Sequence, residues 1–164
     1  MPPAERLRRK LSVRAHCCTL VLVKRPEESG AHVVQKALLW VRYLPRYPEL
    51  RVEQHLPFPS RYKPDLYALD ATGQGVVFWG ECGVVSAEKL RALLRGHPAC
   101  HFVFSKWATR VDPFAAQIDA ALAGVRRRAA VELVGFPADA DAWLDDPDGP
   151  AWDEAAVASR RWDA

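Results

Sequence analysis

Hydrophobic and polar positions along the chain follow the two periods that separate strands from helices. Residues 11–23 alternate and then become continuously apolar, which predicts a first strand. Residues 32–44 carry apolar side chains at helical spacing and are followed by Pro45, which predicts a helix. Residues 49–56 alternate again and stop at Pro57, so we expect a second strand there.

The middle of the chain has the pattern of a β-hairpin. Two apolar segments, residues 64–70 and 76–83, are separated by Ala-Thr-Gly-Gln-Gly at 71–75, which has the glycines of a tight turn. Strands joined by a short turn pair in antiparallel fashion. The head of the first segment is therefore expected to meet the tail of the second.

Helices and strands alternate in the second half of the chain. Ser86 is a suitable N-cap, with Lys89 three residues on, and predicts a helix over 87–94 that Gly96 ends. The remaining elements are a strand at 101–104, a helix from Pro113 to about Val125, a strand at 131–136, and an acidic, loop-rich stretch from Pro137 onward. This order predicts an α/β protein with a central mixed β-sheet flanked by helices.

Length and composition place this chain among ordinary globular domains. Its 164 residues suit one domain, with a core at about 11–146 and peripheral segments at 1–10 and 147–164. No apolar run approaches the roughly 20 residues that span a bilayer, and no secretory leader is evident, so we expect a cytoplasmic protein without a membrane segment. The four cysteines have no CxxC spacing and are expected to be reduced, mostly buried thiols.

Charge is spread unevenly along the chain. The formal net charge is only +3, but residues 132–164 hold nine acidic residues against two arginines, which leaves the rest of the chain basic. A basic body attracts polyanions, so nucleic acid is one expected partner. The alternative is a solvated surface of mixed charge with an acidic tail.

Two carboxylates at the open end of the predicted hairpin are the main chemical signal. Asp65 begins the first segment and Glu81 lies near the end of the second. Mg²⁺ binds hard carboxylate oxygens and activates water for phosphodiester hydrolysis. The backbone carbonyl of Cys82 would be a third oxygen ligand. The lysine expected two residues after the glutamate is absent, because position 83 is glycine.

Two lysines are candidates for the missing basic group. Lys89 lies in the first turn of the next helix, and Lys106 follows the strand at 101–104. His32 and Gln35, on the first helix, are expected at the edge of the same cleft. Structural alternatives remain for both lysines: Lys89 as a solvated helix residue, and Lys106 as a cover for the ring of Trp107.

Several segments resemble the YaeQ family in order and spacing. The hairpin segment from Pro64-Asp65-Leu66-Tyr67 to Phe78-Trp79-Gly80-Glu81-Cys82-Gly83 is similar to the family's central motif, and Glu88-Lys89-Leu90-Arg91 follows it. The helix at 35–43 and the stretch from Phe102 to Ala142-Trp143-Leu144 also match the family's order. The resemblance covers roughly residues 11–146.

The resemblance implies a variant of the PD-(D/E)XK, or restriction-endonuclease-like, fold. In the family, too, glycine replaces the motif lysine, and a basic residue on the next helix is the natural substitute, which corresponds to Lys89 here. This chain departs from the family in a shorter polar loop before the first helix. It also has Val85-Ser86 where the family has Pro-Asp, which removes an acidic residue near the site.

Two functions follow from these observations. The first is a Mg²⁺-dependent nuclease or related phosphodiesterase that uses Asp65, Glu81 and Lys89, with Lys106 as the second candidate lysine. The second is a catalytically inactive protein of the same fold that binds nucleic acid or a protein partner. A lysine that reaches the carboxylates favours the first function. Asp65 and Glu81 carboxylates that lie well beyond the reach of a shared metal ion, or a Lys89 that points away, favour the second.

Overall fold

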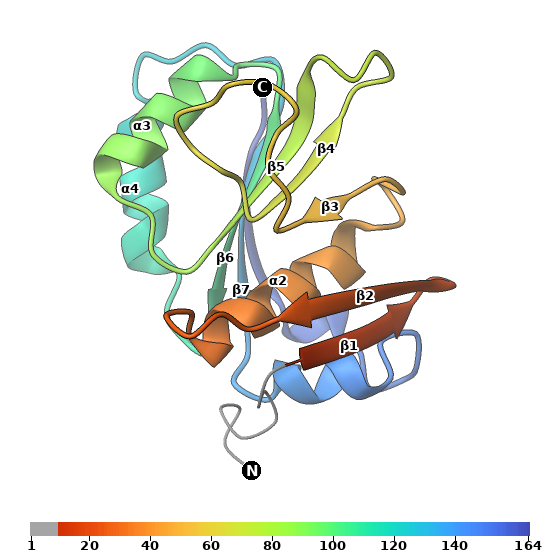
Figure 1. The fold of residues 1–164 in the computed structure, drawn as a ribbon. Helices are drawn as coiled ribbons and strands as arrows, with labels where there is room; N and C mark the ends of the chain where they lie inside the picture. The colour runs from red at the N-terminus through yellow and green to blue at the C-terminus, as the bar shows by residue number, and fades with distance from the viewer. Residues whose placement is uncertain (1–9) are drawn as a thin grey trace.

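A computed structural model describes residues 10–164, and most of the predicted peripheral segment 1–10 lies outside these residues. Six strands form a mixed sheet in the order β3-β4-β5-β6-β7-β8 (Figure 1). Their bounds are Arg51–Val52, Leu66–Leu69, Val76–Cys82, His101–Trp107, Val131–Phe136 and Ala158–Trp162. The three central strands β5, β6 and β7 are parallel, and the others pair in antiparallel fashion. The predicted mixed sheet and the predicted hairpin are confirmed.

The helices cover both faces of this sheet. Helix α2 (Gly30–Tyr43) lies on one face, and α3 (Ala87–Gly96) and α4 (Asp112–Leu122) lie together on the other (Figure 1). Strand β5 divides its side chains between the two faces: Phe78 and Cys82 belong to the core under α2, and Trp79 belongs to the core under α3 and α4. This alternation follows from the period of two along a strand. None of the helices described is long and apolar enough to cross a membrane.

The predicted single strand at 11–23 is wrong, because the chain reverses inside it. Strands β1 (Lys10–Ala15) and β2 (Cys18–Val23) form a separate two-stranded sheet. His16 and Cys17 make the turn with φ of 51° and 62°, although neither is glycine. Cys17 and Cys18 are therefore exposed, and the prediction of buried thiols holds only for Cys82 and Cys100.

Two other predictions at the edges of the sheet need correction. The strand predicted at 49–56 is only β3, because Glu53 takes a φ of 62° and leaves the extended conformation. The stretch from Pro137 is not merely loop: it contains two short 3-10 helices, Ala140–Asp145 and Glu154–Ala156, and then β8. Most of β8 is exposed, so it lacks the apolar alternation that reveals a strand in a sequence.

A buried polar network joins α2 to the start of the parallel strands. Glu132 on β7 accepts hydrogen bonds from the hydroxyl of Tyr43 and from Arg161, and its Oε2 lies 3.2 Å from Nε2 of His101. Burial alone would raise the pKa of Glu132, but the hydrogen bonds from His101 and Tyr43 hold it at about 2. Above pH 4.5, the Glu132 carboxylate therefore stabilises the fold.

This network predicts a loss of stability in acid. Because the folded pKa of Glu132 is depressed, its contribution is present above the ordinary value of 4.5 and is lost as the pH falls toward about 2. We expect a loss of up to about 3 kcal/mol over this interval. Urea unfolding at a series of pH values measures it. Glu132→Gln should flatten the profile, whereas the exposed Glu49→Gln should leave it unchanged; an unaltered slope in Glu132→Gln would contradict the assignment.

Candidate functional site

The strand register places Asp65 beside the end of β5. Leu66 pairs with Gly80, and the Asp65 N–H donates to the Gly80 carbonyl at 3.1 Å. Asp65 therefore stands next to Glu81 at the open end of the hairpin. The sequence of Leu66 to Leu69, nearly all buried, anchors this end against α2.

Glu81 is held from the side of α3. Its side chain is only 4% exposed and accepts hydrogen bonds from Trp79 Nε1 at 2.8 Å and Lys89 Nζ at 2.9 Å. Burial, followed by the negative charge of Asp65, raises the pKa of Glu81 above its ordinary value, and the Lys89 contact only partly offsets this. Ser86 caps α3 through the Lys89 N–H at 3.1 Å, which sets the first turn so that the Lys89 side chain reaches Glu81.

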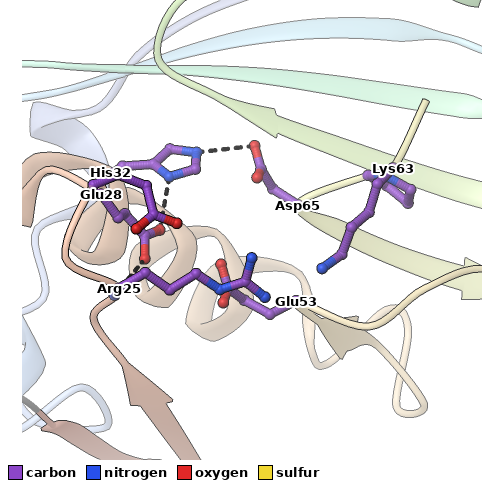
Figure 2. Close-up of a pocket in the computed structure, with 8 residues that line it drawn as sticks. Arg25, Glu28, His32, Glu53, Lys63 and Asp65 are labelled. Atoms are coloured by element: carbon purple, nitrogen blue, oxygen red, sulfur yellow. Dashed lines mark hydrogen bonds and ion pairs between the residues drawn. The ribbon is translucent and has the colours of Figure 1, made fainter.

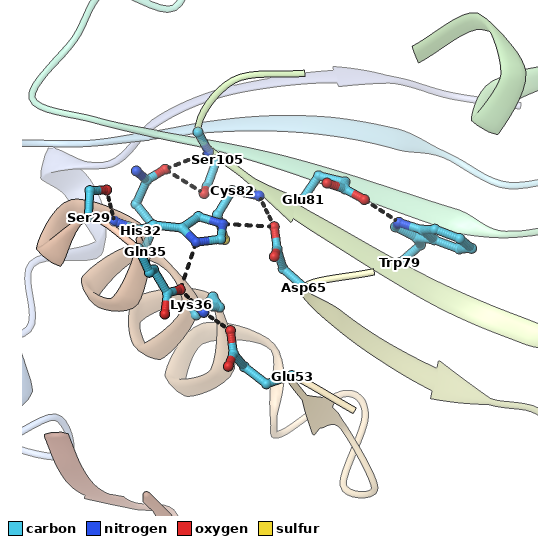
Figure 3. A network of polar contacts seen from close by, with 12 residues as sticks. Ser29, His32, Gln35, Lys36, Glu53, Asp65, Trp79, Glu81, Cys82 and Ser105 are labelled. Carbon is cyan, nitrogen blue, oxygen red and sulfur yellow. Dashed lines mark hydrogen bonds and ion pairs between the residues drawn. The ribbon is translucent and has the colours of Figure 1, made fainter. Parts of the chain in front are cut away.

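Asp65 is held from the side of α2. Its Oδ2 accepts from the Cys82 N–H at 2.9 Å and lies 3.2 Å from Nε2 of His32 (Figure 3). Burial would raise the pKa of Asp65, but the contact with His32 and the bond from Cys82 hold it below its ordinary value. The two carboxylates thus have opposite shifts: Asp65 favours the ionised form and Glu81 resists it.

Gln35 ties α2 to the turn after β5. Its Oε1 accepts from the Gly83 N–H at 3.2 Å and from the Ser105 hydroxyl at 2.9 Å, and the side chain is 5% exposed. Gly83 itself has a φ of +78°, with no atom near its missing Cβ. Gln35 was expected at the edge of the cleft. It is instead a buried side chain whose hydrogen bonds connect α2 to β6 and to the turn after β5.

Within residues 10–164, Lys106 forms no ion pair with Asp65 or Glu81. Its ammonium donates to the Gly83 carbonyl and lies 4.1 Å from the centroid of the Phe114 ring. Burial lowers the pKa of Lys106. The sequence suggested that this lysine covers Trp107, but the ring it covers is that of Phe114.

A second charged group on α2 lies next to Asp65 and was not predicted. The Lys36 ammonium contacts the carboxylates of both Glu28 and Glu53, and its side chain is 1% exposed. His32 joins this group to Asp65, because its Nδ1 lies 2.8 Å from Glu28 Oε1 while its Nε2 faces Asp65. Burial lowers the pKa of His32, but the contacts with Asp65 and Glu28 outweigh burial and raise it. Figure 3 shows this line of contacts from Glu53 to Cys82.

One signal in the sequence pointed to part of this group. Glu28, His32 and Lys36 recur at intervals of four, which places them on one side of the helix and its entry. No signal in the sequence indicated that Lys36 is buried. Its partner Glu53 lies in the turn that follows β3, and helical spacing does not connect this turn to α2.

A cavity of about 250 Å³ opens in front of Asp65. The segment before α2, the turn after β3 and the segment before β4 form its walls (Figure 2). Its lining residues are Arg25, Glu27, Glu28, His32, Glu53, Lys63, Pro64 and Asp65. Glu81 and Lys89 are not among them, so the cavity belongs to the Asp65 side of the hairpin.

The side chains offer few ligands for a metal ion. Within residues 10–164, no group of three or more His, Cys, Asp or Glu side chains is arranged to hold one. Asp65 and Glu81 would therefore bind an ion only together with backbone or water oxygens, as Mg²⁺ commonly is bound.

Comparisons with solved structures place the fold in one class, an α/β fold like that of YaeQ. The crystal structure of the YaeQ protein from Pseudomonas syringae matches with a TM-score of 0.55 and 14% identity, covering 87% of this chain and 81% of that one. The YaeQ protein from Xanthomonas axonopodis pv. citri matches with a TM-score of 0.54 and 16% identity, covering 83% of this chain and 76% of that one. Neither a family model nor a curated protein matches the sequence. The resemblance to YaeQ proteins is confirmed at the level of the fold.

Proposed function

We propose that this protein is a metal-dependent phosphodiesterase that cleaves nucleic acid, with a site of the PD-(D/E)XK type. The observation that carries the proposal is the contact of 2.9 Å between Lys89 Nζ and Glu81 Oε2. This contact brings a lysine from the following helix to Glu81. The motif lysine, expected two residues after Glu81, is absent because position 83 is glycine. Asp65, Glu81 and Lys89 then supply the residue types that this chemistry requires.

The two carboxylates fit a divalent cation in charge and in donor chemistry. Burial, followed by the negative charge of Asp65, raises the pKa of Glu81, and a cation between the two carboxylates would offset this repulsion. Each oxygen of Glu81 accepts one hydrogen bond, from Trp79 or Lys89, and each retains a second lone pair. The contacts of the Asp65 carboxylate with Cys82 and His32 both fall on Oδ2, which leaves Oδ1 for an ion.

Each residue then has a distinct role. Asp65 and Glu81 would hold Mg²⁺, which lowers the pKa of a bound water and neutralises charge on the phosphate. Lys89 places a positive charge where negative charge develops in the transition state, and its bond to Glu81 fixes its position. His32 orients the Asp65 carboxylate through the contact at 3.2 Å.

The test combines metal uptake with cleavage. Calorimetric titration with Mn²⁺ should show binding to the wild type, and single- and double-stranded DNA and RNA should be cleaved only with Mg²⁺ or Mn²⁺ present. Glu81→Ala should abolish both results. Glu88→Ala is the matched control, because Glu88 is an exposed acid on α3 that pairs with Arg61. Absence of both metal uptake and cleavage in the wild type would refute the proposal.

A second function is favoured by the direction of the two carboxylates. The Asp65 carboxylate is directed toward α2, whereas that of Glu81 is directed toward Trp79 and α3 (Figure 3). Both carboxylates already accept hydrogen bonds from protein donors, as expected of a protein that has kept these residues but does not carry out the reaction. This second candidate is a catalytically inactive protein that binds nucleic acid or a protein partner. Binding of nucleic acid that weakens with salt, without turnover at any metal concentration, would support its nucleic-acid form.

A further inference from the structure

Two positive side chains in the cavity have no partner within the part of the chain that the structure describes. Arg25 and Lys63 line it together with Asp65, and neither side chain makes a hydrogen bond or ion pair with another residue in the range 10–164. Arg25 comes from the segment before α2, and Lys63 from the segment before β4. Figure 2 shows both side chains directed toward the space between these segments.

Most acidic groups in the cavity, by contrast, are already paired. Lys36 contacts both Glu28 and Glu53, and His32 contacts both Glu28 and Asp65. Of the lining acids, Glu27 alone forms no ion pair with a cation among residues 10–164, and its side chain is exposed. The unpaired charges that face the cavity are therefore chiefly positive.

The positive charges also repel one another. Burial lowers the pKa of Lys63, and the charges of Arg25 and Lys36 lower it further, against the opposing pull of Asp65 and Glu28. A bound anion would remove this repulsion. A cavity of about 250 Å³ lies below the range of about 300–1,000 Å³ typical of drug-sized ligands, so it suits a small anionic group.

We propose that Arg25 and Lys63 form a phosphate-binding subsite that holds a phosphate group of the nucleic-acid strand beside Asp65. Arginine binds phosphate oxygens in a bidentate fashion, and lysine adds a mobile point charge, so the pair suits this group. The inference rests on the proposed function, because it takes a nucleic-acid strand as the ligand. It adds the direction of approach: the strand enters from the side of α2 and β4 rather than from that of α3.

Binding without turnover tests the subsite separately from the chemistry. The probes are short fluorescein-labelled thymidine strands with a 5′-phosphate, a 3′-phosphate or neither, titrated in EDTA and followed by fluorescence anisotropy. Arg25→Gln/Lys63→Gln should weaken binding by about ten-fold or more, as expected for lost charge-assisted hydrogen bonds. It should also reduce the slope of log affinity against log salt by about 1.4, the value for two lost contacts to a single strand.

The matched control is Lys10→Gln/Arg14→Gln, which removes two exposed charges from β1. It should change affinity and salt slope little. A loss confined to phosphorylated strands assigns the subsite to a terminal phosphate, and an equal loss for all strands assigns it to a backbone phosphate; both support the proposal. Wild-type affinity in the Arg25/Lys63 variant, or an equal loss in the control, would overturn it.

Cleavage by the same variants separates the two proposals. If the wild type cleaves with metal and the Arg25/Lys63 variant has an unchanged KM, the subsite is wrong and the phosphodiesterase stands. If binding depends on Arg25 and Lys63 but no metal supports cleavage, the subsite stands and the phosphodiesterase fails. A wild type that binds none of the strands overturns the subsite. Thermal unfolding of each variant confirms that these surface changes leave the fold intact.

Discussion

Lys36→Met is expected to lower the free energy of unfolding by about 3–5 kcal/mol at neutral pH. The Lys36 ammonium is the cation shared by Glu28 and Glu53, and its side chain is 1% exposed. Methionine keeps much of the side-chain length but leaves the carboxylates of Glu28 and Glu53 without the cation that they share. Such uncompensated charges cost far more than a surface ion pair contributes. Urea unfolding followed by tryptophan fluorescence measures the loss.

The effect should depend on pH in a defined direction. Burial alone would raise the pKa of Glu28, but Lys36 and His32 hold it below its ordinary value of 4.5. Its stabilising contribution is therefore present above pH 4.5 and is lost as the pH falls through the folded pKa. The difference between the wild type and Lys36→Met should shrink over that interval.

Two controls distinguish charge from packing. Lys36→Met/Glu28→Gln/Glu53→Gln, which removes all three charges, should recover most of the lost stability. Lys63→Met alters a nearby lysine that forms no ion pair within residues 10–164 and should change the unfolding free energy by less than about 0.5 kcal/mol. If the triple variant is as unstable as the single one, the loss comes from packing and the ion-pair account is wrong.

Glu81→Gln is expected to reduce the proposed metal-dependent cleavage by more than about 100-fold while making the protein more stable at neutral pH. Loss of a hydrogen-bond partner of a metal ligand already costs about 10–100-fold, so loss of a ligand itself should cost more. The side-chain oxygen of glutamine still accepts from Trp79. The variant therefore removes the charge and keeps the local contact.

The gain in stability follows from the sign of the pKa shift. Because the folded pKa of Glu81 lies above 4.5, this group favours folding below pH 4.5 and loses that contribution as the pH rises through the folded value. At neutral pH, the buried carboxylate therefore opposes folding, and glutamine removes this cost. Below pH 4 the two proteins should have equal stability. A variant that is less stable at neutral pH would mean that the bond to Lys89 outweighs burial.

Thermal and urea unfolding of the wild type and Glu81→Gln at pH 4 and pH 7 measure the change in stability. Cleavage assays on the same two proteins measure the change in activity. Glu88→Gln on the exposed face of α3 is the matched control, with activity and stability near those of the wild type. A Glu81→Gln variant that cleaves nucleic acid as fast as the wild type would exclude Glu81 from the reaction, whatever its stability.

The parts of the fold with strong periodicity were predictable, and the parts that rely on turns were not. Helix α2 and the β4–β5 hairpin carry clear apolar patterns, which is why their positions agree with the prediction. The β1–β2 hairpin was missed because His16 and Cys17 adopt positive φ without a glycine to mark the turn. Strand β8 was missed because its side chains are almost all exposed.

The same contrast holds for the candidate site. Spacing along the chain was enough to single out Asp65, Glu81 and Lys89, since each lies at the end or start of a periodic element. The ion pairs of Lys36 depend on Glu53, a residue in a left-handed turn, and on the loop that holds Glu28. Contacts between a helix and two loops leave no periodic signal, so only the three-dimensional structure reveals them.

The turn at Gly83 determines whether a lysine at position 83 could reach Glu81. Strand β5 ends at Cys82, and Gly83 has a φ of +78° that L side chains rarely adopt. In a continuing strand, a residue two positions after Glu81 would share its face, but the strand does not continue. Engineering a lysine into position 83 would therefore strain the backbone without aiming an ammonium at Glu81. A single exchange at position 83 would therefore not place a lysine at the proposed site, and variants that test its basic group belong on the helix that carries Lys89.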